Sequence, residues 1–264
     1  TGAAARGRVL AVMGPSGAGK TTLLRVLSLQ APFGGRWSGR VTLGGAEMSE
    51  SVFRSECYLV EQENVLCRTL TARETLTFAA ALYGRSDVAR VAEASLSMLG
   101  LEAAGDVRVG GAGSGARDTG FSGGGSGLSG GQKRRLSLGI ALVKRPRLLL
   151  LDEPISGLDA ASAYHLASKL SAIATSEAVA VVATLHQPSS RVYGCCDEVL
   201  LLTMGRVAYS GPSADVAAYF TALGAAPASV GQTSLNPAEF VLDCINADFA
   251  SEQRVAEILD AWDR

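Results

Sequence analysis

The chain has 264 residues, of which 47% are hydrophobic, 19% charged and 6% aromatic. A chain of this length and apolar content buries roughly 70% or more of its unfolded surface, which excludes overall disorder and makes disulfides and metals unnecessary for folding. The 24 Lys and Arg side chains offset 25 Asp and Glu side chains to a formal charge of -1. This balance excludes a broad basic surface for nucleic acid or anionic lipid.

The five cysteines are scattered, and the one close pair, Cys195 and Cys196, is adjacent in sequence. Adjacent cysteines strain a disulfide and match no usual zinc spacing, so we expect reduced thiols in a cytosolic compartment. The longest apolar runs fall far short of the ~20 residues that cross a bilayer, so no membrane span is predicted. Because the chain starts without a Met or an apolar signal segment, we expect a fragment of a longer protein.

In chain order, the first half of the sequence predicts alternating strands and helices. The expected strands are 8–13, 41–43 and 57–61, and the expected helices are 21–29, 71–83 and 88–99. Residues 110–127 are mostly Gly and Ser. They bury too little apolar surface to offset the entropy of ordering, so we expect a mobile loop there.

The second half continues the alternation. Helices are expected at 132–143, 160–173, 213–223, 237–245 and 252–262, and strands at 147–151, 179–185, 198–203 and 206–209. The first two of these strands are continuous apolar runs, typical of a parallel sheet that is buried on both faces. Strands that alternate with helices indicate an α/β fold.

A glycine-rich segment lies between the first predicted strand and the first predicted helix. It matches the phosphate-binding pattern G-x-x-x-x-G-K-[ST] with Gly14, Pro15, Ser16, Gly17, Ala18, Gly19, Lys20 and Thr21. Its glycines let backbone N–H groups approach phosphates, Lys20 reaches the outer phosphates and Thr21 can hold Mg²⁺. The next residue, Thr22, is also predicted to bind the nucleotide. The segment matches the whole pattern and lies between a strand and a helix, as a phosphate-binding loop requires. This disfavours the alternative of a simple glycine turn followed by a surface lysine.

Two carboxylates, Asp152 and Glu153, directly follow the apolar run at 148–151. Open α/β sheets bind ligands at the carboxyl ends of their strands. Asp152 is therefore predicted to hold Mg²⁺ through water, and Glu153 to polarise an attacking water molecule. An apolar strand that ends in acids is common by itself, but the phosphate loop upstream disfavours a purely structural role.

Five consecutive residues narrow the class of phosphate-loop enzyme: Leu128, Ser129, Gly130, Gly131 and Gln132. They resemble the signature motif of ATP-binding cassette ATPases, and the resemblance continues to Asp159, which matches the D-loop of that family. At the start of a helix, Ser129 and the following amides form an anion-binding N-terminus. The resemblance implies that this site faces the γ-phosphate held by a second cassette, whereas a simple helix cap is the alternative.

Two single residues take their roles from this resemblance. Gln62 aligns with the Q-loop glutamine, which would touch Mg²⁺ and link the nucleotide to the transport machinery. His186 aligns with the switch histidine, which would hydrogen-bond the γ-phosphate. The other histidine, His165, lies within a predicted helix and is interpreted as structural.

The resemblance covers nearly the whole chain and implies one nucleotide-binding domain over residues 1–264. It implies a P-loop NTPase core with a mostly parallel sheet, an antiparallel β subdomain, a helical signature subdomain at approximately 63–145 and a helical linker at approximately 235–264 that leads to a missing membrane domain. The implied ligands are ATP and Mg²⁺. Thr21, Gln62 and Asp152 would hold the metal, and Lys20, Glu153 and His186 would act in hydrolysis.

Segments 69–76, 183–189 and above all 236–243 resemble the white, or G, subfamily of eukaryotic exporters. This resemblance implies a Mg²⁺-dependent ATPase at the cytosolic face of a membrane. It would pair head to tail with an identical or different cassette, and a transmembrane domain would follow on the same chain. Sterols, other lipids and amphipathic xenobiotics are the implied substrates, and no nucleic-acid partner is implied.

The main alternative is a soluble cassette ATPase that acts on ribosomes or nucleic acid. Such a protein would be expected to show tandem cassettes, a long coiled coil or basic tracts, and none is visible in the sequence. A non-catalytic module with the cassette fold is disfavoured because no essential motif residue is missing. A GTPase would need an Asn-Lys-x-Asp segment, which does not occur.

Overall fold

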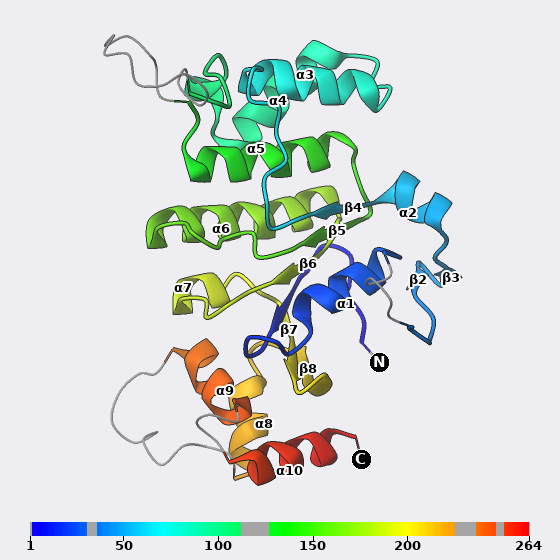
Figure 1. The fold of residues 1–264 in the computed structure, drawn as a ribbon, viewed down its shortest axis with the longest axis vertical. Coiled ribbons are helices and arrows are strands. Elements are labelled where there is room, and N and C mark those ends of the chain that lie inside the picture. Colours follow the sequence, from blue (N-terminus) through cyan, green and yellow to red (C-terminus); the bar gives the residue numbers. More distant parts are fainter. Residues whose placement is uncertain (1, 31–35, 112–126, 225–235, 247–250, 264) are drawn as a thin grey trace. The chain divides into compact units, whose positions relative to one another are not determined.

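The computed structural model describes residues 2–30, 36–111, 127–224, 236–246 and 251–263 (Figure 1). The chain divides into two compact units. The first comprises Thr1–Leu59 and Arg147–Arg264 and is called the sheet unit here. The second, Val60–Pro146, is called the helical unit. In sequence, the helical unit is thus inserted into the sheet unit.

A six-stranded sheet in the order β4-β5-β6-β1-β7-β8 forms the centre of the sheet unit. Its strands are β1 (Val9–Met13), β4 (Cys57–Val60), β5 (Leu148–Leu151), β6 (Ala180–Thr184), β7 (Glu198–Thr203) and β8 (Arg206–Pro212). β1 pairs in parallel with β6 and β7, β5 pairs in parallel with β6, and β7 and β8 are antiparallel. A separate antiparallel pair joins β2 (Thr42–Leu43) to β3 (Ala46–Glu47). The predicted α/β class, with its mostly parallel sheet, is confirmed.

Both faces of the parallel strands are buried, which explains their continuous apolar sequences. On one face, Leu10, Val12, Leu150 and Val182 pack with Leu24 of helix α1 (Lys20–Leu27). The intervening residues point the opposite way, where α6 (Ala160–Glu177) contacts β1 and β6. Each fully buried Leu or Val side chain contributes about 1.5–3 kcal/mol to folding. The central position of β1 places the loop that follows it in the middle of the carboxyl edge of the sheet.

Helices α8 (Val216–Ala222), α9 (Pro237–Ile245) and α10 (Glu252–Trp262) follow β8. α10 packs against β8, where the ring centroids of Tyr209 and Trp262 lie 5.6 Å apart. Arg206 of β8 also forms ion pairs with Asp260 and Asp263. α9 contacts α8 and the short helix α7 (Ser190–Tyr193). These helices are therefore part of the sheet unit.

The helical unit is built around three helices, α3 (Ala72–Leu82), α4 (Val88–Leu99) and α5 (Gly130–Val143), which contact one another pairwise. Leu76, Leu96, Leu99 and Leu136 supply fully buried side chains from all three helices. α5 comes close to its neighbours at Gly139, where a Cβ would lie 2.7 Å from Cδ1 of Leu99. The absence of a side chain at this position therefore permits the tight packing.

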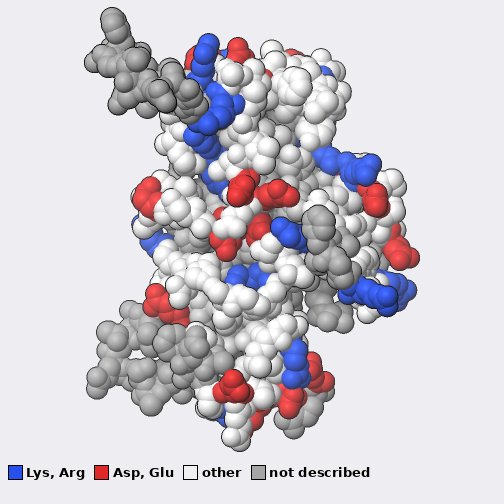
Figure 2. Space-filling model, viewed as in Figure 1, with Lys and Arg blue, Asp and Glu red and all other residues white. Residues whose placement is uncertain are grey.

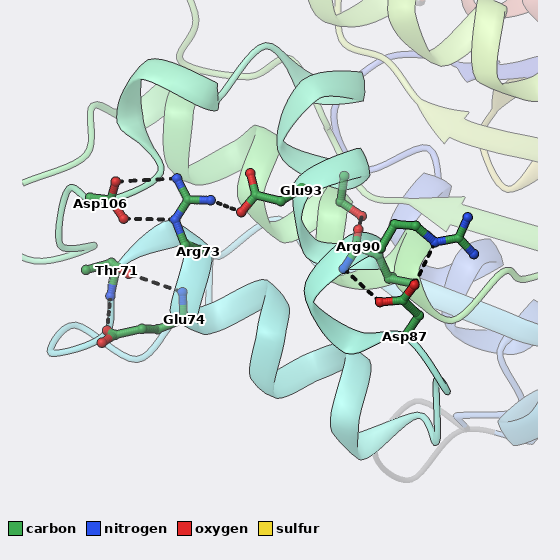
Figure 3. Close-up of polar contacts among 9 residues, drawn as sticks. Thr71, Arg73, Glu74, Asp87, Arg90, Glu93 and Asp106 are labelled. Atoms are coloured by element: carbon green, nitrogen blue, oxygen red, sulfur yellow. Dashed lines mark hydrogen bonds and ion pairs between the residues drawn. The ribbon is translucent and has the colours of Figure 1, made fainter.

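Polar contacts fix the ends of these helices (Figure 3). Thr71 and Glu74 form a reciprocal capping box at the start of α3. Arg73 of α3 pairs with Asp106 beyond the short 3-10 helix Glu102–Ala104, and with Glu93 of α4. The guanidinium of Arg73 lowers the pKa of the Asp106 carboxyl through hydrogen bonds. One cation therefore joins three segments of the helical unit.

The predicted bounds agree with the structure for α4, α9, α10 and β7. The structure also contains α2 (Glu50–Glu56), β3, α7 and the 3-10 helix, which the sequence did not predict. These elements are short, and α2 has no buried residue to mark an apolar period. Of the mobile loop expected at 110–127, residues 112–126 lie outside the described part of the chain.

The five cysteines all lie in the described part of the chain, and none of them forms a disulfide. Burial raises the pKa of Cys196 to about 12 and that of Cys244 to about 11. Cys67 of the helical unit is exposed, and hydrogen bonding with the Thr69 hydroxyl lowers the pKa of its thiol. The cysteines therefore differ sharply in accessibility and ionisation.

Within the described ranges, no helix combines the length and the apolar character that a bilayer span needs. Figure 2 shows basic and acidic side chains interspersed over the described part of the face in view. This mixture matches the nearly balanced net charge of the sequence.

Candidate active site

Glycines shape the loop between β1 and α1. Gly17 and Gly19 have φ values of 79° and 101°, in a region that residues with a Cβ rarely adopt. Gly14 is required for a different reason, because a Cβ there would overlap the carbonyl oxygen of Leu202 on β7. No side chain caps α1 at Gly19. The amides of the loop and of the first helical turn are therefore suited to bind phosphate oxygens.

Lys20 begins α1, and its ammonium turns back over the loop. Nζ donates hydrogen bonds to the carbonyl oxygens of Gly14 at 2.9 Å and Pro15 at 3.0 Å. The residue is only 8% exposed. Burial lowers the pKa of this ammonium, and the nearby carboxylates of Glu153 and Asp152 partly oppose the shift. Phosphate oxygens would give this buried cation partners of opposite charge.

Asp152 follows β5 and is 7% exposed. Its Oδ1 accepts a hydrogen bond from Oγ1 of Thr184 at 2.7 Å and another from Oγ1 of Thr21 at 3.2 Å. Carboxylate and hydroxyl oxygens belong to the hard donors that Mg²⁺ prefers. Thr21 and Asp152 therefore fit the role of magnesium ligands that the sequence predicts.

Glu153, the proposed base, has a constrained backbone. Its φ is 45°, which is uncommon for a residue with a side chain and is found preferentially at functional sites. Its backbone N–H donates a hydrogen bond of 2.8 Å to Oγ1 of Thr184. The hydroxyl of Thr184 thus holds both Asp152 and Glu153, and Thr184 is fully buried.

His186 lies beside the phosphate loop, beyond the end of β6. Its Nε2 is 3.4 Å from Oγ of Ser16, and both residues are exposed. Ser16, Glu153 and His186 line one cleft of about 580 Å³, together with Ile155, Ser156, Gly157, Leu158, Gln187 and Pro188. The cleft therefore brings the phosphate loop, Glu153 and His186 together within the sheet unit.

Asp159 is the N-cap of α6. Its Oδ1 accepts hydrogen bonds from the amides of Ala161 at 3.1 Å and Ser162 at 3.0 Å. Hydrogen bonds from Ser162 and from backbone amides lower the pKa of its carboxyl. Gly157, two residues before Asp159, has a φ of 72°. This geometry shapes the segment that lines one side of the cleft.

The signature segment forms the start of α5 in the helical unit. Oγ of Ser129 accepts from the amide of Gln132 at 3.2 Å, and Oε1 of Gln132 accepts from the amide of Ser129 at 2.8 Å. This capping box makes α5 begin at Gly130, two residues before the predicted start at 132. Leu128 is buried, whereas beyond the chain neighbours of Gly130 and the backbone of its own helix, no heavy atom of the described chain lies within 4 Å of the position for a Cβ on Gly130.

Gln62 lies in the helical unit, in a segment that a buried arginine holds. Nη1 of Arg134, on α5, donates to the carbonyl oxygens of Glu61 and of Gln62, the latter at 3.2 Å. Ser137 donates to Oδ1 of Asn64 at 3.0 Å. The backbone of the Gln62 segment is therefore fixed to the same helix that carries the signature residues.

The predicted site residues fall into two groups. The sheet unit carries Gly14, Pro15, Ser16, Gly17, Ala18, Gly19, Lys20, Thr21, Thr22, Asp152, Glu153, Asp159 and His186. The helical unit carries Gln62, Leu128, Ser129, Gly130, Gly131 and Gln132. Sequence reasoning missed two residues that support these groups, Thr184 and Arg134. In the sequence, Thr184 is marked only as a polar residue near the end of an apolar strand. Arg134 is marked only as a member of the basic cluster 133–135.

Comparison with known proteins adds independent information. The family model described as ABC transporter matches residues 2–156. The chain is 35% identical over 262 residues to ABC transporter G family member 8 of Dictyostelium discoideum, a match that covers 98% of this chain and 39% of that protein. It is 40% identical over 245 residues to ABC transporter G family member 21 of Arabidopsis thaliana, covering 91% and 34% respectively.

ABC transporter G family member 1 of Petunia hybrida is 37% identical over 255 residues, which are 94% of this chain and 37% of that protein. The chain therefore spans 34% to 39% of the length of these three relatives.

Proposed function

Because this chain belongs to the ABC transporter family and is an ABC-type ATPase domain that binds ATP, we propose that it powers the export of lipid-like or amphipathic substrates across a membrane. MgATP brings two such domains together head to tail, and hydrolysis lets them separate. The longer protein carries a membrane domain, with this domain on the cytosolic side. The observation that carries the proposal is the grouping of Lys20, Thr21, Asp152, Glu153 and His186 in one unit.

Hydrolysis forms a bond from a water oxygen to the γ-phosphorus of ATP and breaks the bond from that phosphorus to the bridging oxygen of ADP. Glu153 accepts the proton that the attacking water loses. Lys20 neutralises charge on the outer phosphates, and His186 donates a hydrogen bond to a γ-phosphate oxygen. Thr21 and Asp152 would hold Mg²⁺, and the bound ion would neutralise further phosphate charge. Gln62, which lies in the helical unit, stays a predicted ligand of the metal.

The second domain completes each site. Ser129 and the amides after it are supplied to the γ-phosphate of the partner, where the N-terminus of α5 favours an anion. The open space beside Gly130 supports this role, because no other part of the described chain approaches the position of a Cβ there. Leu128 and Gln132 support the segment by burial and by the capping box.

The alternative, a soluble cassette ATPase that acts on ribosomes or nucleic acid, is not favoured, because the relatives reported above are named as transporters. The reading frame that contains this chain tests the choice. About six apolar spans of ~20 residues each, encoded after Arg264, would support the exporter. A second cassette without such spans would support the alternative.

The sharpest test of the site uses the Glu153→Gln variant, which keeps the shape of the side chain and loses the base. We expect ATP hydrolysis to fall below detection, while saturating MgATP converts the chain from monomer to dimer in light scattering. Unchanged hydrolysis would remove the role of Glu153. A monomer at every MgATP concentration would contradict a nucleotide site that is shared between two chains.

A matched control adds Lys20→Ala to Glu153→Gln. Because Lys20 holds the outer phosphates in the proposal, the double variant should stay monomeric at ATP concentrations that pair the single variant. Equal pairing of the two proteins would show that dimer formation does not report on this phosphate site.

A further inference from the structure

The turn that carries His186 is held in an unfavourable backbone conformation. Gln187, directly after His186, has a φ of 44°, a left-handed value that a Cβ disfavours. His186 and Gln187 are exposed, so burial of their own side chains does not hold them in place. The residues on either side of the turn must therefore stabilise it.

The upstream end of the turn is fixed to the sheet. Thr184 is bonded to Asp152 and to the backbone of Glu153, as described above. The amide of Leu185 donates to the carbonyl oxygen of Val12 on β1 at 3.0 Å. The chain is therefore immobilised up to the residue before His186.

The downstream end is fixed by Asn236. Its Nδ2 donates a hydrogen bond of 2.8 Å to the carbonyl oxygen of Pro188, two residues after His186. Its Oδ1 accepts from the amide of Ala238 at 3.1 Å and so caps α9. The side chain of Asn236 thus joins the start of α9 to the end of the turn. Both contacts are possible because an amide side chain carries a hydrogen-bond donor and an acceptor.

α9 is firmly held at its other end as well. Oγ1 of Thr203, on β7, donates to the carbonyl oxygen of Ile245 at 2.8 Å. Ala238, Val241 and Ile245 are buried at 1% exposure or less. Asn236 is therefore presented by an element whose position is set by the sheet.

We propose that Asn236 is a positioning residue for His186. By holding the carbonyl oxygen of Pro188, it keeps Gln187 left-handed and keeps His186 beside Ser16 at the phosphate loop. The inference rests on the proposed function, because it takes His186 as the group that contacts the γ-phosphate. Asn236 itself is not among the residues that line the cleft described above, so it acts through the backbone of the turn.

The test separates the two contacts of Asn236: the helix cap, in which Oδ1 accepts from the amide of Ala238, and the tether, in which Nδ2 donates to the carbonyl oxygen of Pro188. In Asn236→Asp, the carboxylate still caps α9, because Asp is as good an N-cap as Asn, but it cannot donate to Pro188 and it repels that carbonyl oxygen. In Asn236→Gly, the tether is also lost and helix capping is only slightly weakened. Ser251→Ala is the matched control, since it removes the cap of α10, where Oγ of Ser251 accepts from the amide of Arg254.

The first readout is the nuclear magnetic resonance of the histidine side chains. The chain has two histidines, His165 and His186, so a His165→Gln variant assigns both. In the Glu153→Gln background, we expect MgATP to shift the His186 signals strongly. Both Asn236 variants should lose most of this shift while their affinity for MgATP stays within about twofold, and Ser251→Ala should keep the full shift. A full shift in both Asn236 variants would overturn the inference.

The second readout is turnover, measured with Glu153 intact. Misplacing a catalytic group by about 1 Å can cost up to 10²-fold in rate, so we expect kcat of both Asn236 variants to fall about tenfold with little change in KM. His186→Gln distinguishes a failure of the proposed role of His186 from a failure of the proposed role of Asn236. If it keeps full kcat, the proposed role of His186 fails. If it loses activity while both Asn236 variants keep theirs, only the role of Asn236 fails.

Discussion

At the scale of single residues, the hydroxyl of Thr184 occupies a decisive position. It donates to Oδ1 of Asp152 and accepts from the amide of Glu153. One buried oxygen therefore holds both the carboxylate of Asp152 and the backbone of Glu153. While this hydroxyl is present, it couples the position of the Asp152 carboxylate to that of the Glu153 backbone.

Thr184→Val tests this arrangement with a side chain of nearly the same shape. It removes the donor to Asp152 and leaves the amide of Glu153 without that acceptor, which should cost about 1–3 kcal/mol in the free energy of unfolding. We expect kcat for ATP hydrolysis to fall by at least about tenfold, because both groups lose their orientation. Thr184→Ser should recover most of the activity. Denaturant unfolding and steady-state kinetics measure the two effects.

Thr203→Val is the control for that prediction. Thr203 is also a buried threonine at a strand end, 2% exposed, but its hydroxyl bonds only to the carbonyl oxygen of Ile245 among the contacts described. It should lose comparable stability, but its kcat should fall much less than that of Thr184→Val, because the buried side chains of α9 still hold that helix in place. If both variants lose the same stability and the same activity, Thr184 has no special role at the site.

The contrast between Thr184 and Lys20 shows what a sequence can predict at this scale. Lys20, Thr21, Asp152 and Glu153 stand in local patterns with defined spacing, and the structure brings them together. Thr184 contacts Asp152 across 32 positions of sequence. Only the parallel pairing of β5 with β6 makes them neighbours, and no local pattern records that pairing.

At the scale of elements, capping residues determine where a helix begins, and small residues determine how closely it packs. The capping box of Ser129 and Gln132 starts α5, and Gly139 lets α5 approach α3 and α4. A sequence predicts such a helix from its apolar period, but that period did not locate its first turn, which is Gly-rich and polar. For the same reason the polar helix α2 was missed, since none of its residues is buried.

Gly139→Ala tests the close approach within the helical unit. The new Cβ would lie 2.7 Å from Cδ1 of Leu99 and 2.9 Å from Cδ2 of Leu76. Overpacking of this kind should destabilise the unit by about 1–3 kcal/mol, more than the gain in helix propensity returns. Thermal or denaturant unfolding measures the loss.

A double-variant cycle makes the cause specific. In a Leu99→Ala background the closer of the two contacts is absent and a cavity remains into which Leu76 can shift, so Gly139→Ala should cost less stability than it does in the unchanged chain. A destabilisation of the same size in both backgrounds would show that the cost of Gly139→Ala does not come from Leu99.

At the scale of the whole molecule, the predicted site residues are divided between the sheet unit and the helical unit. The residues proposed to hold phosphate lie in the first unit, and the signature segment lies in the second. The proposed dimer gives this division a purpose, because one chain supplies the first set and its partner supplies the second.

Hydrogen exchange on the Glu153→Gln variant tests that division. At protein concentrations where the chain is monomeric, MgATP should slow exchange at the phosphate loop and leave the signature segment unchanged. At concentrations where dimers form, the amides of 129–132 should also become protected. Protection of the signature segment that does not depend on protein concentration would contradict a shared site.

The uneven environment of the five thiols has a practical consequence. Cys67 is exposed and its thiol ionises more readily than usual, whereas burial raises the pKa of Cys195, Cys196 and Cys244. A maleimide dye should therefore attach to Cys67 in preference to these three cysteines. Such a label would lie shortly after Gln62, and its fluorescence would follow that segment through a catalytic cycle without the introduction of a new cysteine.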